Sequence, residues 1–163
     1  MIALWLVPLI LALDQVSKWV VARAMVEYQS IPVFGDFFRL TYIHNPGAAF
    51  GINVGSPPVH LLFSLVALGV LVWLFRTSPP GARLLRCSLC LVLGGALGNI
   101  IDRVRLGEVI DFFDFGLGQW RWPVFNVADS FVTIGIFLLV LTYGRHREPE
   151  TAAPSATPPG DLV

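Results

Sequence analysis

The chain contains 163 residues, of which 55% are hydrophobic and only 13% are charged. Because a soluble globular domain has about 25% charged residues, this chain has too little polar surface to cover a water-soluble fold. Its hydrophobic content also excludes an intrinsically disordered protein. The net charge of +0 and the lack of a basic stripe exclude a nucleic-acid-binding domain, so no nucleic-acid partner is expected. An integral membrane protein with one domain, residues 1–143, is the class that remains.

Four apolar segments are long enough to cross a bilayer as helices, which requires about 20 residues with a range of about 17–25. They cover residues 1–22, 59–75, 84–101 and 124–143. The first segment has no basic region before its apolar run, so we expect a retained span and not a cleaved signal peptide. The sequence therefore predicts an all-α integral membrane protein with four transmembrane helices and both termini on one side.

The connection between the first two spans is too polar to cross a membrane. Residues 31–52 contain short β-favouring runs separated by Gly35, Asn45, Pro46 and Gly47. Such runs between turn-forming residues are typical of short strands. We expect a small β-sheet at the membrane face.

The remaining connections are shorter or less regular. The Thr77–Gly81 segment contains two prolines and a glycine, which cannot continue a helix, and it predicts a tight turn. We interpret residues 102–123 as a loop that enters the fourth span. Residues 144–163 are rich in Pro, Ala, Thr and Glu and predict a disordered tail.

Basic residues flank both ends of the predicted helix bundle. Arg76, Arg83 and Arg86 surround the tight turn, Arg145 and Arg147 follow the last span, and a similar number of basic residues lies at the opposite end. The positive-inside rule counts such residues and gives little weight to acids. Composition alone leaves the orientation open, with a lean toward both termini in the cytoplasm.

Several polar side chains fall where a bilayer disfavours them. An ionisable group inside a span costs at least about 2.5–3.5 kcal/mol, so such groups are usually paired and functional. Helical spacing places Asn99, Asp102 and Arg103 on one face of the third span. The same spacing places Asn126 and Asp129 on one face of the fourth. Both groups lie at helix ends next to the predicted loop.

Three further acids accompany these groups: Asp111 and Asp114 lie in the run VIDFFDF of the predicted loop, and Asp14 lies within the first span. We expect the polar groups to converge on one membrane surface. Carboxylates there could bind Mg²⁺ with phosphate, relay protons or ions in a transporter, or share one proton and activate water. A catalytic zinc site is disfavoured, because it typically uses His or Cys ligands.

Five short motifs follow one another along the chain: Asp14-Gln-Val-Ser-Lys18, Asn45-Pro-Gly-Ala-Ala-Phe-Gly51, Gly94-Gly-Ala-Leu-Gly-Asn-Ile-Ile-Asp-Arg103, Val109-Ile-Asp-Phe112 and Phe125-Asn-Val-Ala-Asp-Ser130. In this order they strongly resemble the bacterial lipoprotein signal peptidase family, signal peptidase II. The resemblance covers about residues 10–142. Five motifs in order are far more specific than any one of them.

This resemblance implies a membrane aspartyl endopeptidase that removes signal peptides from prolipoproteins by cutting before a cysteine that carries diacylglyceryl. It implies an enzyme of the bacterial cytoplasmic (inner) membrane with four transmembrane helices, cytoplasmic termini and an extracytoplasmic active site. No metal or organic cofactor is expected. The expected partners are diacylglyceryl-modified prolipoproteins, membrane lipids and the inhibitor globomycin, and we expect a monomer.

The resemblance also implies roles for individual residues. Asp111 and Asp129 match the catalytic pair, in which one carboxyl group activates a water while the other protonates or polarises the substrate carbonyl. Other positions match supporting residues that contact the substrate or globomycin, namely Asp14, Asn45, Asn99, Arg103 and Asn126.

Two further features of the third span have structural interpretations. We interpret Asp102 as part of an ion pair or helix-end network, because Arg103 is adjacent and Asn99 lies three residues before it. Gly94 and Gly98 form a G-x-x-x-G step, which favours close packing of helices over ligand binding.

Overall fold

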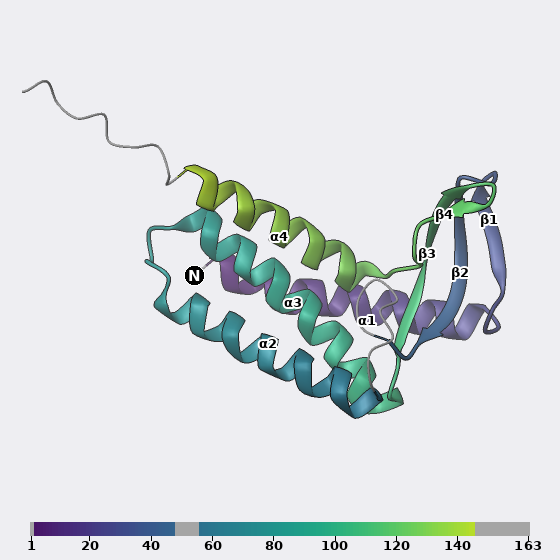
Figure 1. Ribbon diagram of the computed structural model, residues 1–163, viewed down its shortest axis with the longest axis horizontal. Helices are drawn as coiled ribbons and strands as arrows, with labels where there is room; N and C mark the ends of the chain where they lie inside the picture. Colours follow the sequence, from purple (N-terminus) through teal and green to yellow (C-terminus); the bar gives the residue numbers. More distant parts are fainter. Residues whose placement is uncertain (1, 48–55, 146–163) are drawn as a thin grey trace, which may run out of the picture.

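The computed structural model describes residues 2–47 and 56–145, which form a helix bundle with a small sheet at one end (Figure 1). After a 3-10 turn at Ile2–Trp5, the helices are α1 (Leu6–Ala24), α2 (Pro57–Thr77), α3 (Arg83–Leu106) and α4 (Val127–Arg145). Helix α3 contacts each of the other three helices and is therefore the centre of the bundle. The start of α1 and the end of α4 both lie at the end of the bundle opposite to the sheet (Figure 1).

The ends of the helices follow from local chemistry. Pro57 and Pro58 occupy the first positions of α2, where the fixed φ and missing N–H of proline are tolerated. Helix α2 ends at Thr77, before two further prolines, which confirms the predicted turn at 77–81. Helix α3 ends before Gly107, whose φ of +80° lies in the left-handed region that favours glycine.

The helices expose a large apolar surface. By length and hydropathy, two helices in the described part of the chain, α2 and α3, are suited to cross a membrane. In α2 the one buried side chain is His60, whereas Leu62, Phe63, Val66 and Trp73 are each more than half exposed. Such a continuous apolar surface is unfavourable in water and is solvated well by lipid. The bundle therefore has the surface of a membrane protein.

The sheet is antiparallel and its strands follow one another in chain order. They are β1 (Ser30–Phe34), β2 (Phe38–Asn45), β3 (Val109–Leu117) and β4 (Trp120–Arg121). The prediction of strands within residues 31–52 is confirmed as far as Asn45. Residues 48–52 lie outside the described residues.

The interpretation of residues 102–123 as a loop is wrong. Helix α3 continues to Leu106, and Val109–Leu117 forms the inner strand β3, which pairs with β2 on one side and β4 on the other. Its first four residues are all buried. A strand buried on both faces lacks the alternation of polar and apolar residues that marks an exposed strand.

The predicted tail, residues 144–163, also begins too early. Helix α4 continues through Arg145, past the apolar run that ends at Tyr143, because no proline follows that run before Pro149. Residues 146–163 lie outside the described residues.

An apolar cluster fixes the sheet to the bundle. Val21 of α1 and Met25 just after it pack with Tyr42 of β2 and with Ile110 and Phe112 of β3, and each is at least nine-tenths buried. Successive side chains of a strand point to opposite faces. Asp111, which lies between Ile110 and Phe112 in β3, therefore points away from this cluster.

Small residues allow α3 to approach its neighbours closely. A Cβ atom on Gly94 would press against Ile10 of α1, and one on Gly95 would overlap the carbonyl oxygen of Ala128 in α4. Gly98 is equally crowded. The interpretation of Gly94 and Gly98 as packing residues is confirmed.

Gly95→Ala should destabilise the fold by about 1–3 kcal/mol, the usual cost of overpacking. The new methyl group would overlap a backbone oxygen, which cannot move without shifting α4. Gly69→Ala in α2 is the matched control, because a Cβ atom there meets no other atom within 4 Å. Thermal unfolding in detergent measures both variants, and equal melting temperatures would contradict the close contact.

Candidate active site

The first turn of α4 builds one half of the candidate site. Asn126 precedes the helix, and its Oδ1 accepts a hydrogen bond of 2.9 Å from the backbone N–H of Asp129, as a helix N-cap does. The hydroxyl group of Ser130 donates to the carbonyl oxygen of Asn126 over 2.9 Å. These bonds fix the turn that carries the Asp129 side chain.

Strand β3 provides the other half. Asp111 pairs with Ile43 of β2 and is 1% exposed. Its Oδ2 accepts a hydrogen bond of 2.8 Å from Nδ2 of Asn45, and its Oδ1 accepts one of 2.6 Å from Nδ2 of Asn126. Asn126 thus contacts both acids, Asp111 through its NH₂ group and the backbone of Asp129 through its oxygen.

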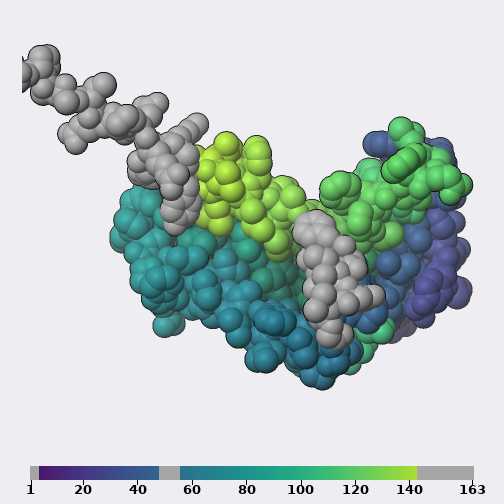
Figure 2. Space-filling model, in the orientation of Figure 1, coloured from purple at the N-terminus to yellow at the C-terminus, as the bar shows by residue number. Residues whose placement is uncertain are grey.

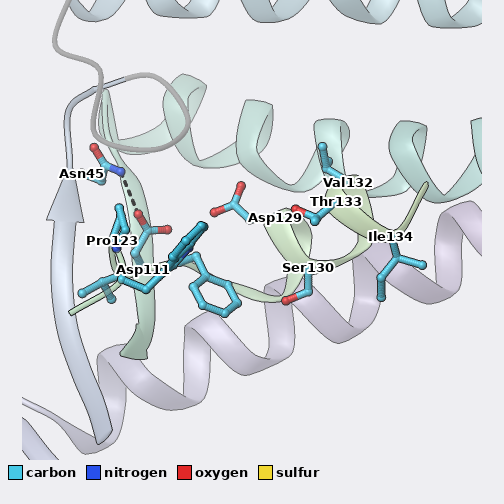
Figure 3. A pocket seen from close by; sticks show the side chains of 11 residues that line it. Asn45, Asp111, Pro123, Asp129, Ser130, Val132, Thr133 and Ile134 are labelled. Carbon is cyan, nitrogen blue, oxygen red and sulfur yellow. Dashed lines mark hydrogen bonds between the residues drawn. The ribbon is translucent and has the colours of Figure 1, made fainter. Parts of the chain in front are cut away.

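The two acids face one cavity of about 380 Å³. Figure 3 shows the carboxylate of Asp129 pointing toward Asp111. Asn45 lines the same cavity, and its apolar wall includes Trp122, Phe125, Val132 and Ile134. The cavity therefore places two acids beside space for an apolar ligand.

A second cavity, of about 650 Å³, is lined by α2, α3 and α4. Asp129 and Val132 line both cavities. The polar residues His60, Asn99 and Arg103 line the second one, and the rest of its wall is almost entirely apolar. Asp129, in the first turn of α4, therefore borders two largely apolar cavities.

Burial raises the pKa of Asp111 to about 7, and the charge of Asp129 adds to this rise. The hydrogen bonds from Asn45 and Asn126 and the cation of Lys18 oppose it. Two carboxyl groups that repel each other in this way can hold one proton as a pair. Within residues 2–47 and 56–145, no three His, Cys, Asp or Glu side chains gather as a possible metal site.

A buried ion-pair network lies behind the two acids. Lys18 of α1 is 2% exposed, and its Nζ lies 2.8 Å from a carboxylate oxygen of Asp14 and 2.8 Å from one of Asp102. Nε2 of Gln15 donates to both carboxylates. Lys18 also donates to Oδ1 of Asn99 over 2.9 Å. We call these five residues the Lys18 cluster.

Asn99 connects the Lys18 cluster to the candidate site. Its Nδ2 donates to Oδ1 of Asp129 over 2.7 Å. Its Oδ1 accepts from Lys18 and, over 3.1 Å, from Nδ2 of Asn126. The buried charges and the cavity are thus joined by one amide.

Most predicted site residues lie together. Six either line a cavity or donate a hydrogen bond to an acid, namely Asn45, Asn99, Arg103, Asp111, Asn126 and Asp129. Asp14 differs, because it lines neither of these cavities and makes no hydrogen bond to Asp111 or Asp129. Its Oδ1 instead accepts the backbone N–H of Ala128 at the start of α4.

Asp102 belongs to a structural network, as interpreted, but its ion-pair partner is Lys18 of another helix. It also accepts the backbone N–H of Ile110 over 3.3 Å, which joins α3 to β3. Our sequence reasoning missed Lys18 and Gln15 as members of the site. The available signal was the opposite charge of Asp14 and Lys18, which lie one helical turn apart within an apolar span.

Comparison with known proteins reveals extensive similarity. A family model described as signal peptidase (SPase) II matches residues 6–144. The chain is 48% identical over 148 residues to the lipoprotein signal peptidase of Desulforapulum autotrophicum, covering 87% of this chain and 91% of that protein. It is 43% identical over 147 residues to that of Syntrophotalea carbinolica, covering 88% and 91%. A solved "bacterial membrane enzyme" structure matches with a TM-score of 0.84 at 31% identity, covering 93% of this chain and 92% of that chain.

The raised pKa of Asp111 should make folding stability depend on pH. The pKa of an unfolded aspartate is about 3.9, whereas the folded value is about 7. The folded state therefore binds the extra proton, and this contribution to stability is lost as the pH rises through that range. Asp111→Asn cannot titrate, so its stability relative to the natural chain should increase by up to about 1.4 kcal/mol per pH unit between about pH 5 and 7. Unfolding in detergent measures the difference, and a pH-independent value would contradict the raised pKa.

Proposed function

The chain belongs to the signal peptidase II family of membrane proteases, and on this premise we propose that it removes signal peptides from diacylglyceryl-modified prolipoproteins. Cleavage occurs before the lipidated cysteine, with Asp111 and Asp129 as the catalytic pair. The observation that carries the proposal is that both acids line one cavity with an apolar wall. A lipidated peptide requires apolar space beside the groups that cut it.

The two acids have complementary roles in the proposed reaction. Protonated Asp111 donates a hydrogen bond to the scissile carbonyl oxygen, while Asp129 takes a proton from the water that attacks the carbonyl carbon. The carbonyl oxygen receives the Asp111 proton as the tetrahedral intermediate forms. When the C–N bond breaks, Asp129 protonates the leaving nitrogen, and the new carboxyl group returns a proton to Asp111. Both acids end in their starting states.

Neighbouring amides support this division of roles. Asn45 and Asn126 donate to Asp111, and Asn99 donates to Asp129. Fixed donors in a site of low dielectric keep reacting groups oriented without reorganisation during the reaction. We assign these three amides and Arg103 to support of the acids and binding of the substrate or globomycin. Asp14 is the exception among the predicted residues, and its role is structural.

The two cavities suit a substrate with two apolar parts. A lipidated precursor carries acyl chains on its cysteine and an apolar signal peptide on the other side of the scissile bond. Asp129 borders both cavities, of about 380 and 650 Å³, so each can receive one part while the bond lies beside the acids. Both have predominantly apolar walls, as the substrate requires.

We further propose that α1 to α4 all cross the cytoplasmic membrane, with the sheet at its extracytoplasmic face and both termini in the cytoplasm. Helices α1 and α4 have 19 residues each, within the range of about 17–25 that crosses a bilayer. Val16 and Trp19 of α1 and Phe137 and Val140 of α4 are each more than half exposed, as lipid-facing side chains would be. In this proposal residues 1–143 act as one monomeric unit among membrane lipids, without a metal or organic cofactor.

Asp111→Asn and Asp129→Asn should each lower the rate of cleavage of a lipidated precursor by about 10²–10⁴-fold, because each removes one proton-transfer group. The matched control is Asp114→Asn on the same strand. Asp114 accepts hydrogen bonds from Arg121 and Thr41 and lines neither cavity. This control should retain turnover, and near-normal turnover in either of the first two variants would refute the catalytic pair.

The rate of cleavage should also fall with increasing pH above about 7, because Asp111 then loses the proton that the reaction requires. Asn45→Ala should move this decline to higher pH, since the Asn45 hydrogen bond lowers the pKa of Asp111. Profiles of kcat/KM against pH for the two proteins provide the measurement. A decline that stays in place or moves to lower pH would contradict the assignment of the proton to Asp111.

A further inference from the structure

We propose that Lys18 is a positioning residue for the catalytic pair, which it orients through the Asn99 amide and through two backbone anchors. The inference rests on the proposed roles of Asp111 and Asp129. Lys18 lies on α1, whereas the acids lie on β3 and α4. It acts through intervening groups.

The acceptors around Lys18 match its three N–H groups. They are a carboxylate oxygen of Asp14, a carboxylate oxygen of Asp102 and Oδ1 of Asn99, at 2.8, 2.8 and 2.9 Å. A lysine ammonium only donates hydrogen bonds. The atom of the Asn99 amide that faces Lys18 must therefore be its oxygen.

This constraint fixes the opposite side of the amide. With its oxygen held by Lys18 and Asn126, Asn99 presents its NH₂ group to Oδ1 of Asp129. A flipped amide would place its oxygen against the Asp129 carboxylate and its NH₂ group against the ammonium. Both contacts would be repulsive, so the charge of Lys18 selects one orientation.

The two carboxylates that pair with Lys18 anchor the backbone beside the catalytic acids. Asp14 accepts the N–H of Ala128, the residue before Asp129, over 2.9 Å. Asp102 accepts the N–H of Ile110, the residue before Asp111, over 3.3 Å. One cation thus holds in place both carboxylates that fix these backbones.

Lys18 also affects the charge balance of the site. Its cation lowers the pKa of Asp111, in opposition to burial and to the charge of Asp129 on α4. Arg103 on α3 is a further charged group that interacts with Asp111. Loss of Lys18 should therefore move the alkaline decline of activity to higher pH, an effect that a purely structural residue would not produce.

Two variants that differ only at Lys18 test the inference. Lys18→Met/Asp102→Asn keeps one net negative charge in the Lys18 cluster, as in the natural chain, whereas Asp102→Asn alone keeps Lys18 and serves as the reference. Against that reference, the double variant should lose at least about tenfold in kcat, toward the roughly 10²-fold cost of a 1 Å misplacement, with KM nearly unchanged. The fall in the activity of the double variant at alkaline pH should also move to higher pH. If the two variants have the same kcat and their activity falls over the same pH range, the inference is overturned.

The assay uses the full chain in detergent or vesicles and a synthetic lipopeptide with a diacylglyceryl-modified cysteine. If the double variant does not fold, Asn99→Leu provides the test, because it leaves Lys18 with both carboxylates and removes the donor to Asp129. It should lose kcat to a similar extent, and an unchanged kcat would overturn the inference.

The catalytic pair and the Lys18 inference can fail separately. Cleavage by Asp111→Asn or Asp129→Asn would refute the pair itself. Loss of cleavage in both of these variants, together with full activity of Lys18→Met/Asp102→Asn relative to its reference, would refute the role of Lys18 alone.

Discussion

The ammonium group of Lys18 is held among packed helices by two carboxylates, and much of the remaining structure depends on this contact. A buried ion costs several kcal/mol unless close partners and hydrogen bonds compensate it. Asp14 lies on the same helix as Lys18, whereas Asp102 lies on α3, so the pairing sets the register of α1 against α3. Crowded glycines on α3 permit the approach that this register requires.

Neutral amides lie between these buried charges and the two acids of the proposed catalytic pair. Asn99 and Asn126 each accept hydrogen bonds on their oxygen and donate hydrogen bonds from their nitrogen. The buried charges are therefore linked to the two acids through directional hydrogen bonds. Asp111 is surrounded by neutral donors from Asn45 and Asn126 and by the charge of Asp129, and it is buried. That environment, with few compensating cations, explains why its pKa rises to about 7.

The sequence predicted the positions of the helices well, because long apolar runs are a strong helix signal and prolines mark several of their boundaries. Motif resemblance pointed to Asp111 and Asp129, and the structure places both in the wall of one cavity. Helical spacing predicted that the groups of Asn99 and Asn126 lie at one end of the bundle, and these two side chains are hydrogen-bonded. Strand β3 was missed because burial on both faces removes alternation. The contacts of Lys18 with Asp102 and of Asp14 with Ala128 join distant segments, so no local pattern predicts them.

In the proposed reaction, Asp111 and Asp129 act together on one scissile bond. A crystal structure with a bound non-cleavable lipopeptide, whose scissile amide is replaced by a hydroxyl-bearing analogue of the tetrahedral intermediate, would show whether they do. One carboxylate oxygen of each aspartate should lie within hydrogen-bond distance, about 2.5–3.0 Å, of that hydroxyl group. If the analogue lies in the cavity and only one of the two carboxyl groups contacts it, the two acids do not act as a pair.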